Sequence, residues 1–141
     1  MEYLQEEEDM QLENVVAVRT AYEAYANGDL QTMLEFVHED LEWTYLDPAL
    51  AAPEPQVCHG RVELEQALVH WAEHGFRAEL EEVEGKGDRV MVCVRTPGID
   101  DHRGRHGDDR SYVVLTVRDG TIVALRDCHD RDEARALAGL G

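Results

Sequence analysis

The hydrophobic pattern at the start of the chain is helical. Apolar side chains recur at spacings of three and four residues from Leu12 to Tyr25, the spacing of one face of an α-helix. Gly28 ends this pattern, because glycine readily adopts the left-handed conformation found at helix C-termini. Asp29 can then cap a second, short helix that reaches Val37.

The pattern then changes to short runs rich in β-branched and aromatic residues, interrupted by two helical stretches. Asp119-Gly120 is typical of a tight turn between two strands. Residues 51–56, which contain two prolines, and residues 97–109 are expected to be loops. The predicted strands are 41–45, 77–84, 89–96, 110–118 and 121–128, and the remaining predicted helices are 61–74 and 132–137. Helices that precede a mainly antiparallel sheet predict an α+β fold.

Charge narrows the classes of partner. The chain has 141 residues, with 13 basic and 31 acidic side chains and a formal net charge of −18. Such a surface repels phosphate backbones and anionic lipids, so we expect no nucleic-acid partner and no membrane partner. The acidic first residues lack the pattern of a signal peptide, which predicts a cytoplasmic protein. We expect residues 1–11 to be an acidic extension, either frayed or helical, and residues 12–141 to form one domain.

Several short segments occur in a characteristic order: 21–25 (AYEAY), 27–30 (NGDL), 40–43 (DLEW), 59–61 (HGR), 87–90 (GDRV), 117–123 (VRDGTIV) and 130–137 (DRDEARAL). Together they resemble the SnoaL-like branch of the nuclear transport factor 2-like superfamily over residues 12–141. The resemblance implies a cone-shaped roll, in which a curved, mainly antiparallel sheet wraps around N-terminal helices with a central pocket. Families of this fold include polyketide cyclases, a ketosteroid isomerase, epoxide hydrolases, dehydratases and binding proteins, so the fold does not select a reaction.

The resemblance allows the site to be tested residue by residue. A ketosteroid isomerase mechanism needs a carboxylate base and an oxyanion hole made by tyrosine and protonated aspartate. The corresponding tyrosine position is Ala21, the position of the base is Tyr45, and residues 111–117 contain no carboxylate. That mechanism is therefore rejected.

The comparison with cyclases points to Asp130, because such enzymes carry an acid/base aspartate near the end of the last strand. Arg126 and Cys128 alternate with Asp130 and are expected to share its face. Tyr45 would donate a hydrogen bond to developing negative charge. An aspartate that precedes a helix is also an ordinary N-cap, so both roles for Asp130 stay open.

Other side chains complete the predicted site. An epoxide-hydrolase network would use Asp47, Arg126 and Asp130, although no spacing joins them and surface pairing of Arg126 with Asp127 is the simpler interpretation. The predicted substrate-binding residues are Trp43, Asp47, Trp71, Tyr112, Arg126 and Cys128. Aromatic rings supply flat apolar walls, and plain core packing is the alternative for both tryptophans.

We expect no metal and no cofactor. His102 and His106 lie four residues apart, but in the predicted loop 97–109 this spacing has no helical meaning. The loop itself is a candidate substrate gate. The sequence thus predicts a protein that binds a small apolar or aromatic ligand and carries out acid/base chemistry of the cyclase, isomerase or hydrolase type on it. The alternative is a non-catalytic module that binds a hydrophobic ligand or forms a homodimer.

Overall fold

The end of the first helix and the start of the second lie at the predicted capping residues. The computed structural model describes residues 2–45, 56–102 and 107–140, with α1 at Glu2–Ala26 and α2 at Leu30–Glu35. Gly28 has a positive φ of 81° between the two helices. The side chain of Asp29 accepts a hydrogen bond from the Thr32 backbone N–H at 3.2 Å, which caps α2. Residues 2–11 continue α1, the helical one of the two predicted alternatives.

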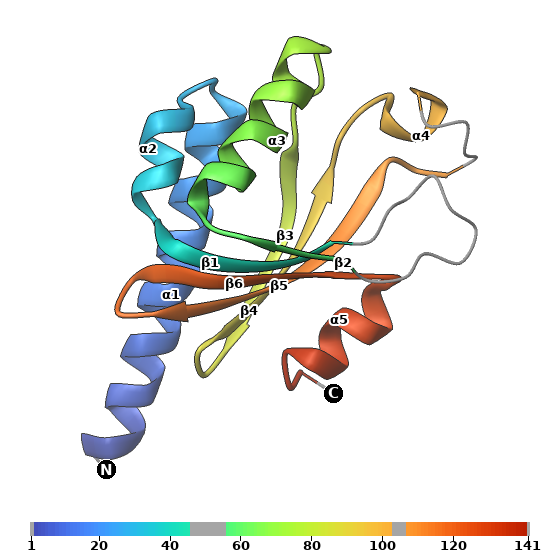
Figure 1. Ribbon diagram of the computed structural model, residues 1–141. Coiled ribbons are helices and arrows are strands. Elements are labelled where there is room, and N and C mark those ends of the chain that lie inside the picture. The colour runs from blue at the N-terminus through green and yellow to red at the C-terminus, as the bar shows by residue number, and fades with distance from the viewer. Residues whose placement is uncertain (1, 46–55, 103–106, 141) are drawn as a thin grey trace.

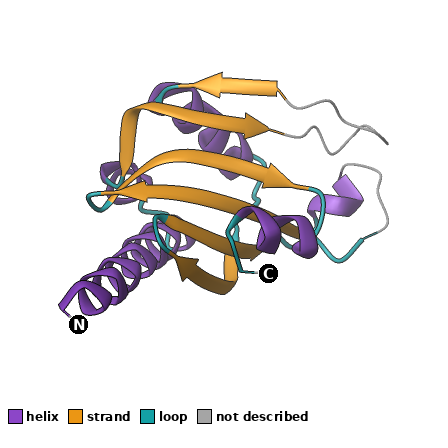
Figure 2. Ribbon diagram, turned by 90° about the horizontal axis from the view of Figure 1, so that it is seen from below, coloured by secondary structure: helices purple, strands orange, loops and turns teal. Residues whose placement is uncertain are grey.

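A single six-stranded sheet follows, with the strand order β2-β1-β6-β5-β4-β3. Neighbouring strands are antiparallel except β1 and β6, which run parallel, as Figure 2 shows. The strands are β1 (Val37–Tyr45), β2 (Gln56–His59), β3 (Glu79–Lys86), β4 (Arg89–Arg95), β5 (Arg110–Arg118) and β6 (Thr121–Cys128). The predicted α+β class with a curved, mainly antiparallel sheet is confirmed.

The two faces of the sheet carry different helices (Figure 1). We call inner the face that packs with α1, α2 and α3 (Arg61–Glu73); its core includes Val18, Leu41, Leu64, Val92 and Leu115. The outer face packs with α5 (Arg131–Leu137), and its smaller core consists of Met91, Val114, Cys128, Ala134 and Ala138. No described helix is long and apolar enough to cross a membrane.

The first strand is longer than the sequence predicted. α2 ends at Glu35, and β1 begins at Val37, where a helical residue was expected. The pairing of β1 with β6 shifts between Val37 and Glu42, and within this irregular stretch the Asp40 N–H donates to His38 Nδ1 at 2.9 Å. The irregular stretch hides the alternation typical of a strand, so the prediction of a helix to Val37 was wrong. Strand β2 was also missed, because only four residues pair along this edge.

The predicted loop 97–109 contains a short helix, α4 (Ile99–His102), and the prediction of a loop throughout was wrong there. Reciprocal hydrogen bonds hold this segment to the start of β5. The Asp109 carboxylate accepts from the Gly98 and Asp100 backbone N–H groups at 3.0 and 2.9 Å, while the Asp109 N–H donates to Asp100 Oδ2 at 3.0 Å. His106 lies outside the described residues. Strand β3 begins at Glu79, two residues later than predicted.

Candidate functional site

A β-bulge in β6 decides which side chains reach the inner face. Val117 pairs with Ile122, but Thr116 pairs with Ala124, so β6 contains one extra residue at this point. An extra residue reverses the facing of every side chain that follows it. Leu125 therefore belongs to the inner core, and Asp127, two residues later, shares that face.

The Asp127 carboxylate is held among inner-face neighbours. It lies opposite Val113 of β5, which packs against the inner core. The Trp43 indole Nε1 donates to Asp127 Oδ1 at 3.2 Å from the adjacent parallel strand β1. Both side chains are half-buried. A half-buried carboxylate with a fixed donor and an apolar neighbour is suited to exchanging a proton with a bound molecule.

Tyr22 of α1 brings a hydroxyl group to the same region. Tyr22 packs against the inner core, so its phenol and the Asp127 carboxylate lie on the same side of the sheet. The pKa of Tyr22 is raised far above its usual range, first by burial, then by the negative charge of Asp127 and by Tyr25. Tyr22 therefore remains protonated at neutral pH and can donate a hydrogen bond.

Cys58 completes this group, which we call the inner-face cluster: Asp127, Trp43, Tyr22 and Cys58. Cys58 pairs directly with Trp43 across β1 and β2. Burial raises the pKa of the Cys58 thiol, and the charges of Glu63 and Asp127 raise it further. The thiol is thus kept protonated, which argues against a thiolate nucleophile at this position.

Asp130, the predicted acid/base residue, caps α5. Its side chain accepts a hydrogen bond from the Glu133 backbone N–H at 2.8 Å, and the residue is exposed. The capping interpretation is confirmed, while the catalytic role stays a prediction. The bulge explains its placement: strict alternation from Ile122 assigns Asp130 to the inner face, whereas the extra residue reverses that assignment.

Three other predicted site residues lie on the opposite face of the sheet from Asp127. Arg126 pairs with Val114, a residue of the outer core, and is exposed. Cys128 is buried in that outer core, and Tyr112 packs against it, with the Arg131 guanidinium 5.8 Å from the centre of the Tyr112 ring. The structure therefore groups Arg126, Cys128 and Tyr112 on the outer face, away from Trp43.

The remaining predicted residues do not join the inner-face cluster. Trp71 of α3 packs edge-on against Phe76 and His102, with ring centroids 5.9 and 6.3 Å apart. Tyr45 ends β1, and Asp47 lies outside the described residues. Of the predicted residues whose side chains are described, Trp43 alone belongs to the cluster. Sequence reasoning missed Tyr22 and the inward position of Asp127; the spacing of Asp127 two residues after the apolar Leu125 was the available signal.

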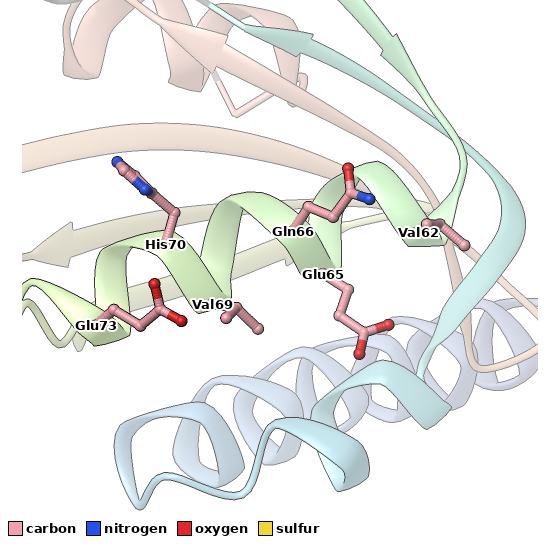
Figure 3. A pocket seen from close by; sticks show the side chains of 6 residues that line it. All are labelled: Val62, Glu65, Gln66, Val69, His70 and Glu73. Atoms are coloured by element: carbon pink, nitrogen blue, oxygen red, sulfur yellow. The ribbon is translucent and has the colours of Figure 1, made fainter.

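A shallow groove runs along the exposed side of α3 (Figure 3). Its lining is Val62, Glu65, Gln66, Val69, His70 and Glu73. None of these residues belongs to the inner-face cluster, so the groove is a separate surface feature. We assign the acid/base role to the inner-face cluster rather than to the groove. The cluster contains a half-buried carboxylate whose charge acts on a buried phenol, and the groove residues include no such pair.

Comparisons with known proteins agree with this architecture. The model of the SnoaL-like domain family matches residues 18–125. A comparison with curated proteins gives no match. Bal32a, from a soil-derived mobile gene cassette, is a similar solved structure, with 23% identity, a TM-score of 0.65, and coverage of 93% of this chain and 98% of Bal32a.

Two further solved structures are similar. TerC, co-crystallised with polyporic acid, is 20% identical with a TM-score of 0.61, and the match covers 91% of this chain and 97% of TerC. A protein from Sinorhizobium meliloti, proposed to be a polyketide cyclase, is 20% identical with a TM-score of 0.59, and the match covers 79% of this chain and 93% of that protein. At these identities the likeness shows the fold alone, and it confirms the predicted cone-type fold.

Proposed function

The chain belongs to the SnoaL-like domain family, and from this premise we propose that it binds a small, largely apolar or carbonyl-bearing compound at its inner face and catalyses a proton transfer there without a cofactor. One observation carries the proposal. The Asp127 carboxylate lies on the inner face, held by Trp43 and electrostatically coupled to the phenol of Tyr22.

The chemistry follows from the protonation states of the two groups. A carboxylate can accept a proton from a carbon next to a carbonyl group, which leaves negative charge on the carbonyl oxygen. A protonated phenol can donate a hydrogen bond to that oxygen as the charge develops. Asp127 would be the base and Tyr22 the donor, while Trp43 would hold the carboxylate in position. This division of roles suits a cyclase or isomerase.

The roles predicted for Asp130 and Tyr45 remain rival assignments. Asp130 could transfer a proton only if its carboxylate left the Glu133 N–H that it caps. Asp127 needs no such rearrangement to face the inner core, which is why we favour it as the base.

A matched pair of variants tests the proposal. Thermal shifts would be measured against polycyclic ketones, phenols, terpenoid epoxides and polyporic acid, and turnover would be measured for each compound that stabilises the protein. We expect Asp127→Asn to keep ligand binding and to lose about 100- to 10,000-fold in turnover. Asp130→Asn should retain turnover, because asparagine also caps a helix. The opposite pattern would transfer the role to Asp130 and overturn our assignment.

The apolar composition of the inner core favours a second candidate, a non-catalytic hydrophobic-ligand-binding protein. Binding without turnover of any bound compound, unchanged by Asp127→Asn, would support that alternative. The predicted homodimer and cytoplasmic location remain predictions. Sedimentation velocity of the full chain would test the homodimer.

A further inference from the structure

Two histidines lie at the C-terminal end of α3, His70 in its last turn and His74 at its C-cap. His70 and His74 are four residues apart, so both imidazoles project from the same side of the helix. Their ring centroids lie 4.4 Å apart, and both residues are exposed. Two imidazoles four residues apart on a helix are a recurring way to hold a transition-metal ion.

The spacing of the rings fits a common ion. With metal–nitrogen bonds of about 2.0–2.1 Å, two imidazole centroids around one ion lie about 4.5–5.5 Å apart for bond angles near 90–110°. The observed 4.4 Å is close to this range, so small side-chain rotations suffice. Among the described side chains, no group of three His, Cys, Asp or Glu residues is arranged to hold a metal. The site would therefore have two protein ligands, with water completing the coordination.

The hydrogen bond of His74 leaves the correct nitrogen available. His74 Nδ1 lies 2.8 Å from the His70 carbonyl oxygen. A carbonyl oxygen only accepts, so Nδ1 carries the proton, and in the neutral ring the lone pair is on Nε2. Imidazoles that bind metals commonly donate their other N–H to a carbonyl in this way, which fixes the orientation of the ring.

Neighbouring rings restrain the pair from a distant part of the sequence. The His102 ring of α4 lies 5.9 Å from the His74 ring and 4.9 Å from the Phe76 ring, and Trp71 packs edge-on to His70 at 5.4 Å. This packing limits the freedom that the imidazoles would lose on binding an ion.

Electrostatics favour a cation at this position. His70 lines the α3 groove together with Glu65 and Glu73, and the chain has a formal net charge of −18. Imidazole ligands select zinc, nickel or copper over magnesium and calcium, which prefer oxygen ligands.

We propose that His70 and His74 form a two-imidazole chelate for a divalent transition-metal ion, with Zn²⁺ as the ion to test, on the exposed side of α3. The site differs from the inner-face cluster and does not depend on the proposed catalytic role of Asp127. Bound zinc would present its water-filled positions beside the α3 groove (Figure 3).

Isothermal titration of the untagged full chain with ZnCl₂ at pH 7.5 tests this assignment. Wild type should bind one equivalent, and His70→Gln and His74→Gln should each weaken binding by at least about tenfold. Binding should weaken as the pH is lowered, because zinc and protons compete for the imidazole nitrogens, and excess MgCl₂ should not compete. Equal affinity of wild type and either variant would overturn the proposal.

His59→Gln is the matched control, since His59 is an exposed histidine beside Cys58, where a rival zinc site could form. Its affinity should equal that of wild type, and a loss there would assign the zinc to the rival site. Nuclear magnetic resonance of the imidazole nitrogens provides a readout without mutation. Zinc should shift the ring signals of His70 and His74 in wild type, and shifts confined to other histidines would refute the site.

Discussion

The indole of Trp43 and the carboxylate of Asp127 join two parallel strands through a hydrogen bond of 3.2 Å between Nε1 and Oδ1. The two residues are 84 positions apart in the sequence, and the contact is partly buried. An indole N–H is a donor only, so the bond directs one carboxylate oxygen toward Trp43. The direction of the Asp127 side chain therefore depends on the pairing of β1 with β6.

We predict that Trp43→Phe removes this donor while it retains an aromatic ring. A hydrogen bond to a charged group contributes about 1.5–3 kcal/mol, so the free energy of unfolding should fall by about that amount. A double-mutant cycle with Asp127→Ala, which removes the acceptor, isolates the contribution of the pair when it is measured by urea denaturation. We expect a coupling free energy of about 1 kcal/mol or more. Additive effects would show that the bond contributes nothing to stability.

The thiol of Cys58 should report the charge of Asp127. Because Asp127 is one cause of the raised pKa of Cys58, Asp127→Asn should lower that pKa and increase the alkylation rate at pH 8. Rates would be measured by iodoacetamide labelling and mass spectrometry of the Cys58 peptide. Asp130→Asn is the control, since Asp130 is not among the charges that raise the pKa of Cys58. An unchanged rate in Asp127→Asn would place the carboxylate away from the thiol.

The cap of α5 predicts different outcomes for two substitutions at Asp130. Asp130→Ala removes the acceptor for the Glu133 N–H and should reduce the free energy of unfolding by about 1 kcal/mol. Asp130→Asn retains a capping oxygen and should change it by only a few tenths. Chemical denaturation of both variants measures the difference. Equal losses for alanine and asparagine would mean that the charge, rather than the cap, stabilises α5.

The sequence predicted the fold well where local chemistry decides the structure. Asp29 and Gly28 fix the ends of neighbouring helices, and Asp119-Gly120 forms the predicted turn, with φ values of 52° and 75°. Such signals depend on single residues and their immediate neighbours, so they can be recognised in the sequence.

The candidate site was harder to predict, because it depends on a bulge. The extra residue in β6 lies among Ile122, Val123 and Ala124, which fit an ordinary strand equally well. The shift can be seen only in the pairing with β5. Because of it, Asp127 lies on the inner face, where strict alternation would have placed Asp130. The contribution of Tyr22 could not be predicted from the sequence either, because it depends on how α1 packs against the sheet.

Gly85 permits the close approach of α1 to β3. A Cβ added at Gly85 would lie 2.7 Å from Cγ2 of Val15, and valine has little rotamer freedom in a helix. Gly85→Ala should therefore lower the free energy of unfolding by about 1–3 kcal/mol. In the background of Val15→Ala the same substitution should cost much less, which thermal or urea denaturation of the four proteins would show. An equal cost in both backgrounds would exclude this contact as the cause.

Asp109 should make the α4 segment sensitive to acid. Hydrogen bonds from the Asp100 and Gly98 backbone N–H groups lower the pKa of Asp109 below the ordinary aspartate value of 3.8. A lowered pKa in the folded state means that the stabilisation is fully present above pH 3.8 and is lost as the pH falls through the lower, folded-state value.

Asp109→Asn should therefore destabilise the protein at neutral pH and show a smaller further loss than wild type below pH 3.8. Urea denaturation between about pH 6 and pH 2 measures both slopes. Asp119→Asn is the matched control, because it also removes one carboxylate at a residue of positive φ, where asparagine is tolerated. Other carboxylates titrate in the same range, so the test compares the pH dependence of the free energy of unfolding between the two variants. If Asp109→Asn and Asp119→Asn lose stability in parallel with wild type, the hydrogen bonds at Asp109 do not stabilise its charged form.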